Sequence, residues 1–219
     1  MRLTVFNGSP RVEKSNTKIL LERFLEGYSQ NPANSHELFY LRKEEPSEMA
    51  EVFGEAENVL LAFPLYVDCM PALVKSFIEG LEPLCGREGN PAMCFLVQSG
   101  FPEAAHSRYV QRYLEKLSRR LGSEYLGTMV KGGVEGIQAK PPWMNRKLFG
   151  YFHDLGEGFG ENGRLDRDIL RKLAQPERLS GPRLAAIKIA LKTGLVDIYW
   201  KLMLKKNDAF DKRFDCPYE

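Results

Sequence analysis

The sequence has no long apolar run, no close pair of cysteines and no excess of charge of either sign. No apolar stretch approaches the ~20 residues that a membrane-spanning helix needs. Basic and acidic residues number 31 and 29, and this balance gives no argument for nucleic acid as a partner. The four cysteines form no C-x-x-C motif and no cluster with histidine, so neither a zinc site nor an iron–sulfur cluster is expected.

Sequence motifs of several common enzyme classes are also missing. No G-x-G-x-x-G follows the first apolar run, which argues against a dinucleotide site of the Rossmann type, and no G-x-x-x-x-G-K-[ST] indicates a nucleoside triphosphatase. No Ser-His-Asp set or pair of carboxylates supports hydrolysis. The chain starts without the basic and apolar segments of a signal peptide, so we expect free thiols and a cytoplasmic location.

Short apolar runs alternate with helical patterns along the first part of the chain. The predicted strands are residues 3–6, 37–41, 58–63, 92–97 and 125–130, and helices are predicted at 18–25, 47–55, 72–81 and after residue 103. This alternation predicts a three-layer α/β fold with a five-stranded parallel sheet between helices. Right-handed crossovers favour the flavodoxin-like strand order 2-1-3-4-5, in which a ligand binds beyond the carboxyl ends of strands one and three.

The loop after the first strand has the composition of an anion site. The first amides of the following helix have no partner within the helix and carry the positive end of its dipole. Four residues near this helix start offer neutral hydrogen-bond donors: Ser9, Ser15, Asn16 and Thr17. Arg11 adds a charged donor, and Gly8 allows a ligand to approach the backbone closely. We therefore expect a phosphate here, although Ser15 or Asn16 serving only as a helix cap is an open alternative.

Two further loops are expected to meet the first one, because carboxyl ends of parallel strands share one edge of a sheet. Residues 64–71 follow the third strand and residues 98–103 follow the fourth, and both contain turn-forming and aromatic residues. The glycine-rich residues 131–136 after the fifth strand should converge on the same edge. The alternative to a ligand-binding role is that Tyr66 and Phe101 are ordinary aromatic residues at the rim of the sheet edge.

Three of these segments, in this order and at strand ends, resemble the NADPH-dependent FMN reductase and quinone reductase branch of the flavodoxin-like superfamily. They are residues 8–11 with 15–17, residues 64–66 followed by 71–77, and residues 99–103. The resemblance implies an FMN cofactor, NAD(P)H as co-substrate, and a quinone or another small electron acceptor. Iron–sulfur flavoproteins of this superfamily carry cysteines between the second and third strands, and residues 42–58 contain none.

The resemblance also assigns residues to parts of the cofactor. Those expected to hold the phosphate are Ser9, Arg11, Ser15, Asn16 and Thr17; those expected to line the isoalloxazine ring are Pro64, Leu65, Tyr66 and Val67, with Ser99, Gly100 and Phe101 from the next loop. No side-chain acid or base is required, because the flavin carries the chemistry. His106 can reach the site, but a solvated helix position is the favoured interpretation.

Two other functions remain open at this stage. One is an electron-transfer flavoprotein without its own NAD(P)H turnover, in the role of flavodoxin. Flavodoxins usually present a strongly acidic face, so the near-neutral charge balance argues mildly against it. The other is a protein of this fold that has lost its cofactor, against which the phosphate-type loop counts.

The resemblance becomes thin after residue 136. We expect residues 1–136 to form the FMN-binding domain and residues 137–219 to form a mainly helical extension, packed on the same domain or on the partner in a homodimer. Residues 141–144 are predicted to break regular structure, and a helix is expected to begin at Arg146 and to end before the glycines at 156–163. Trp143 and Met144 are candidates for a lid over the flavin, with a pinned surface loop as the alternative.

Residues 183–206 are predicted to form one long basic amphipathic helix. The segment has apolar residues along one side and six Lys or Arg against a single acidic residue, Asp197. Such a helix can pack on the domain or across a dimer interface, or it can lie on an anionic membrane surface. Packing is the favoured interpretation.

Overall fold

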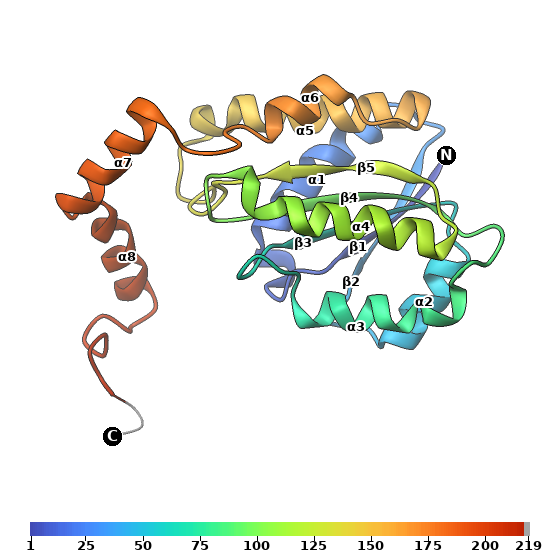
Figure 1. The fold of residues 1–219 in the computed structure, drawn as a ribbon, viewed down its shortest axis with the longest axis horizontal. Helices are drawn as coiled ribbons and strands as arrows, with labels where there is room; N and C mark the ends of the chain where they lie inside the picture. The colour runs from blue at the N-terminus through green and yellow to red at the C-terminus, as the bar shows by residue number, and fades with distance from the viewer. Residues whose placement is uncertain (217–219) are drawn as a thin grey trace. The chain divides into compact units, whose positions relative to one another are not determined.

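The computed structural model describes residues 1–216, except for the side chains of residues 195, 196 and 199. Its centre is a five-stranded parallel sheet with the order β2-β1-β3-β4-β5, which confirms the flavodoxin-like fold (Figure 1). The strands are β1 (Arg2–Asn7), β2 (Ser35–Tyr40), β3 (Asn58–Pro64), β4 (Ala92–Gln98) and β5 (Tyr125–Lys131). Sheet order reverses beside β1, so β1 and β3 form the switch point at which ligands bind in such sheets.

Helices cover both faces of this sheet. Those of the first 178 residues are α1 (Asn16–Tyr28), α2 (Pro46–Gly54), α3 (Ala72–Gly80), α4 (Arg108–Leu121), α5 (Pro142–Asn162) and α6 (Arg167–Leu173), with short 3-10 helices at Val12–Lys14, Glu82–Leu84 and Ala104–Ser107. One buried cluster joins α1, α5 and α6 to the sheet and another joins α2, α3 and α4 to its opposite face. Alternate strand residues feed the two clusters, as the period of a strand requires: Val5 faces the first and Phe6 the second.

Helix α5 differs from the expectation. It begins at Pro142, so residues 142–144 are its first turn and not an irregular loop, and it continues through the glycines to Asn162. Proline is suited to the first turn because its missing amide would have no partner there. The prediction of a later start and an earlier end was therefore wrong, because it rested on local signals alone.

The chain divides into two compact units, residues 1–178 and residues 179–219. Residues 137–178, which the sequence grouped with the extension, therefore lie in the same unit as the sheet. Helices α1 and α5 run beside each other on one face of that sheet (Figure 1).

The second unit contains α7 (Gly181–Lys192) and α8 (Leu195–Lys206) in place of the single helix expected over 183–206. Gly194 separates them with φ of 71°, a left-handed conformation that glycine adopts without strain. Large apolar side chains of this unit are exposed, among them Ile189, Ile198 and Trp200. None of the helices within residues 1–216 has the length and apolar character needed to cross a membrane.

Candidate functional site

The carboxyl edge of the sheet brings the loops after β1, β3 and β4 together. The backbone N–H of Gly8 donates to the carbonyl of Ala62 at 2.7 Å, and that of Leu65 donates to the carbonyl of Gln98 at 2.7 Å. The Gln98 side chain in turn donates to the hydroxyl of Thr17 at 3.2 Å. These contacts connect three neighbouring strands to the start of α1.

The loop after β5 closes the same edge. The N–H of Ser99 donates to Lys131 O at 3.0 Å, and the N–H of Val134 donates back to Ser99 O at 3.0 Å. Asn16 Nδ2 donates to Val134 O at 3.1 Å, and Gln138 Nε2 donates to Asn16 Oδ1 at 2.9 Å. The expected convergence of four loops on one edge is therefore what the structure shows.

A small cavity of about 50 Å³ lies at this convergence. It brings together residues from all four loops: Ser9, Arg11, Asn16, Pro64, Leu65, Tyr66, Gln98, Ser99, Gly100 and Glu135. Eight of these belong to the set expected from the sequence. Gln98 and Glu135 were not in that set. Their positions, at the end of β4 and in the glycine-rich loop after β5, could have indicated that they lie at this edge.

Four of the expected residues do not line this cavity: Ser15, Thr17, Val67 and Phe101. Ser15 caps α1: its hydroxyl accepts from Lys18 N at 3.1 Å and donates to Val12 O at 2.6 Å. The capping alternative is thus observed for Ser15, and Thr17 is occupied by its bond to Gln98. Arg11 is exposed and the first amides of α1 have no intrahelical partner, so these groups are the ones positioned to receive an anion.

The loop after β3 forms a tight turn over residues 66–69. Tyr66 N donates to Cys69 O at 2.8 Å and Cys69 N donates to Tyr66 O at 3.0 Å. The two central residues, Val67 and Asp68, have φ of 48° and 59°. A β-branched valine rarely adopts this conformation, and such residues cost about 1–3 kcal/mol each, so the surroundings must hold the turn in place.

The aromatic side chains at this edge are half exposed. Tyr66 has 46% of its surface accessible and Phe101 has 50%, while Val67 at the tip of the turn has 91%. Phe101 stacks on His106, with ring centroids 4.8 Å apart and planes 28° from parallel. His106 lies in the 3-10 helix Ala104–Ser107, where about a third of its side chain is accessible to solvent and the Phe101 ring covers one of its faces.

Arg11 and Glu135 are the charged side chains that line the small cavity. Arg11 belongs to the loop after β1 and Glu135 to the loop after β5. Lys131, at the end of β5, is partly buried, and this burial lowers the pKa of its amino group. Its Nζ faces the carbonyls of Leu173 and Gln175 at 3.4 Å and not the cavity.

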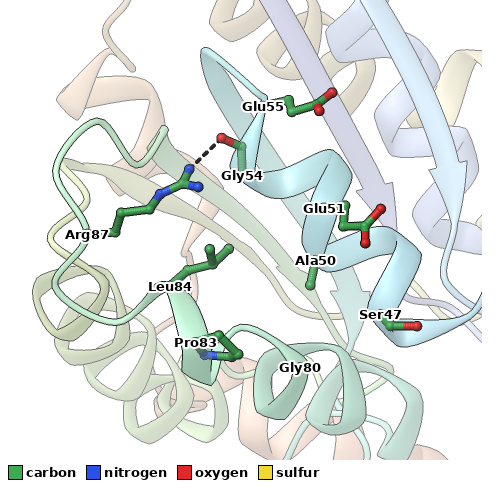
Figure 2. A pocket seen from close by; sticks show the side chains of 9 residues that line it. All are labelled: Ser47, Ala50, Glu51, Gly54, Glu55, Gly80, Pro83, Leu84 and Arg87. Carbon is green, nitrogen blue, oxygen red and sulfur yellow. Dashed lines mark hydrogen bonds between the residues drawn. The ribbon is translucent and has the colours of Figure 1, made fainter.

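A larger cavity of about 450 Å³ lies elsewhere, between α2 and the segment after α3 (Figure 2). Glu51 on α2 and Glu55, the residue that follows this helix, form part of its wall, and the Arg87 guanidinium donates to the carbonyl of Gly54 across from Leu84. None of the residues expected to bind a cofactor lines it. Eight of the residues expected from the sequence instead line the small cavity at the carboxyl edge.

The strand order and the helices on both faces of the sheet define a flavodoxin-like fold, with the polar cavity at its switch point. Among solved structures, an azoreductase from Bacillus anthracis superposes with a TM-score of 0.58 at 16% identity, covering 73% of this chain and 100% of that one. An NADH:FMN oxidoreductase gives 0.55 at 17% identity, covering 80% and 96%. Flavodoxin 1 from Bacillus cereus gives 0.54 at 13% identity, covering 74% and 99%. No family model and no curated protein matches the sequence.

Proposed function

We propose that the protein is an FMN-dependent NAD(P)H oxidoreductase of the FMN reductase and quinone reductase branch. The observation that carries this proposal is the convergence of a helix N-terminus and Arg11 with the strand-end segments 64–66 and 99–100 around one cavity. Two of the three superposed structures are an azoreductase and an NADH:FMN oxidoreductase. Those likenesses support the fold directly and the activity by analogy.

The donor set at the edge fits a flavin phosphate. Arg11 and the first amides of α1 would bind the phosphate by charge-assisted hydrogen bonds and the helix dipole. Ser15 and Asn16 would hold the loop in shape, because their side chains bond to Val12, Lys18 and Val134. The hydroxyl of Ser9 completes the set, since Ser9 lines the cavity.

The residues beyond the phosphate position fit a planar ring. Pro64 and Leu65 are buried and Tyr66 is half exposed, so they would supply an apolar wall. Ser99 and Gly100 place backbone beside it, and Phe101 adds a second aromatic side chain. A bound flavin supplies the redox chemistry, in which hydride arrives from the nicotinamide and electrons leave to a quinone or another small acceptor. The protein residues bind and orient it and exclude water.

An electron-transfer flavoprotein is the second candidate. The flavodoxin superposes almost as well as the oxidoreductase, with TM-scores of 0.54 and 0.55. A carrier of this kind would bind FMN at the same edge but would not be reduced by a nicotinamide. The balanced charge of this chain favours the reductase, because flavodoxins usually present an acidic face.

A visible absorption spectrum tests the proposal. The purified protein is mixed with FMN, dialysed and titrated anaerobically with NADPH and then NADH, and released flavin is identified by mass spectrometry. Retained FMN that bleaches with either nicotinamide supports the reductase. Retained FMN that does not bleach supports the carrier, and failure to take up FMN removes both.

Three further properties belong to the proposal. We propose a cytoplasmic homodimer, with residues 183–206 packed within the assembly in preference to an anionic membrane surface; co-sedimentation with anionic vesicles would contradict that preference. Trp143 and Met144 are exposed on the first turn of α5, which suits a lid or a partner contact. An unchanged flavin affinity and unchanged kinetics in Trp143→Ala would exclude the lid.

A further inference from the structure

His106 connects the two loops that carry the half-exposed aromatic side chains. Its Nδ1 lies 2.9 Å from Asp68 Oδ1 in the turn after β3, and its Nε2 lies 3.5 Å from Glu103 Oε2. Its ring stacks on Phe101 in the loop after β4. One imidazole therefore bonds to one loop through a nitrogen and contacts the other through its face.

The turn that His106 contacts is one that needs support. Asp68 and Val67 both have left-handed backbone conformations, and the turn has only two backbone hydrogen bonds across it to close it, those between Tyr66 and Cys69. The bond from Asp68 to His106 adds a tether that reaches outside the turn. Without that tether the strain favours opening of the turn.

Stacking by His106 also determines which part of Phe101 is available. One face of the phenyl ring is covered by the imidazole, and half of the side-chain surface remains accessible. A planar ligand can therefore contact Phe101 only on the part that His106 leaves open. Offset stacking of aromatic rings at such distances is favourable and directional.

His106 is not held there by general burial. It borders a cavity of about 280 Å³ together with Asp68, Glu103, Tyr109 and Arg178, and about a third of its side chain is accessible. Replacing it removes its contacts with Asp68, Glu103 and Phe101 and creates no closed void. The stability of the fold should therefore respond little to its replacement, which separates a positioning role from a merely structural one.

We propose that His106 is a positioning residue for the isoalloxazine ring of a bound flavin: through Asp68 and Phe101 it fixes the spacing between the loops after β3 and β4. This inference rests on the proposed function. It assigns no proton transfer to His106. Binding of the flavin ring then depends on the pair Asp68–His106, whereas binding of the phosphate depends on Arg11.

The test compares FMN with riboflavin, which has the same ring and no phosphate. Both flavins are titrated by fluorescence quenching into wild type, Asp68→Ala, His106→Ala, the double variant and Asp68→Asn. Either alanine variant should bind both flavins with an affinity about fivefold to tenfold lower than wild type. The double variant should bind no more weakly than the single variants. Asp68→Asn should bind nearly as wild type, since asparagine tolerates the left-handed conformation and its carbonyl oxygen still accepts from imidazole.

Two measurements on the protein without flavin complete the test. The Cys69 amide should exchange hydrogen faster in both alanine variants, because its bond to Tyr66 opens more often. Urea midpoints should stay close to wild type. Unchanged affinities in both single variants, additive losses in the double variant, or losses that follow the urea midpoint would overturn the inference while leaving FMN binding established. Absence of flavin binding by wild type would instead remove the proposed function, and the inference with it.

Discussion

Gly156 of α5 lies directly against the backbone of α1: a Cβ atom built on it would be 1.8 Å from the carbonyl oxygen of Phe24. Gly27 of α1 has the reciprocal relationship, with a Cβ position 2.0 Å from the carbonyl oxygen of His153. The two helices therefore approach each other through a pair of glycines. No side chain larger than hydrogen fits at either position without moving a helix.

Gly156→Ala should destabilise the fold by at least about 1–3 kcal/mol, the range typical of overpacked sites. Gly158 in the same helix is the matched control, because nothing lies within 4 Å of its Cβ position. Gly158→Ala should be neutral or should stabilise by up to about 1 kcal/mol, the difference in helix propensity. Urea unfolding of both variants measures the contrast, and equal responses would contradict the contact.

These glycines also show where sequence reasoning stopped. Strands and their order could be predicted because buried parallel strands read as continuous apolar runs and crossovers are right-handed. The full length of α5 could not be predicted, because glycine lowers local helix propensity. The reason for Gly156 is its close contact with α1, which the sequence does not show. The break at Gly194 could have been predicted, because glycine is common at helix ends. The apolar pattern that continues across Gly194 favoured a single helix instead.

The candidate site was predictable to a similar degree. Strand-end loops identify which residues share an edge, so Ser9, Tyr66 and Ser99 could be placed together. The sequence indicated capping by Ser15 only as an alternative, and it does not show that the Thr17 hydroxyl is bonded to Gln98. The stacking of His106 on Phe101 depends on rotamers and loop conformation, which no sequence pattern encodes.

Under the proposed function, Arg11→Gln should weaken FMN binding by about tenfold or more and leave riboflavin binding unchanged, because the proposed charge-assisted hydrogen bond to the phosphate would be lost. The loss should shrink at high salt, since Arg11 is exposed. Lys116→Gln, an exposed position on α4, controls for overall charge. Fluorescence titration at two salt concentrations measures this, and equal weakening of riboflavin would place Arg11 against the ring instead.

The pair Arg108–Glu177 ties residues 176–177 to the start of the segment 104–108. Arg108 Nε donates to both carboxylate oxygens of Glu177 at 2.9 and 3.1 Å, and this hydrogen bonding lowers the pKa of Glu177. Ala104 N and Ala105 N donate to the carbonyls of Pro176 and Glu177. Exchange of these two amides therefore reports on the pair.

Glu177→Gln should speed exchange of the Ala104 and Ala105 amides about twofold to fivefold at pH 7, in keeping with an exposed ion pair. Because folding lowers the pKa of Glu177, its contribution is complete above the unfolded value of about 4.3 and is lost as pH falls through the folded-state pKa. The ratio of variant to wild-type exchange should therefore approach one in acid. Glu115→Gln, which breaks the pair with Arg119, should leave these amides unaffected at both pH values.

Cys94 should resist alkylation in the folded protein, whereas Cys69, Cys85 and Cys216 are exposed and should react. Cys94 lies inside β4 with no accessible surface, and this burial raises the pKa of its thiol, so the reactive thiolate is disfavoured as well as shielded. Iodoacetamide labelling followed by mass spectrometry should find three modified cysteines in buffer and four in urea. Labelling of Cys94 as fast as Cys85 would contradict the packing of β4.

The hydrogen bonds that close the small cavity join residues very far apart in the chain: Asn16 bonds to Val134 across 118 positions and to Gln138 across 122. Contacts of such separation form late, after local helices and neighbouring strands, because the intervening chain must first be ordered. A nascent chain that has not yet delivered residues 134–138 would have the helix start and Arg11 but no closed cradle. Uptake of the proposed flavin would then mark the completion of folding, and the fraction of a preparation that holds the flavin would count the molecules that have completed it.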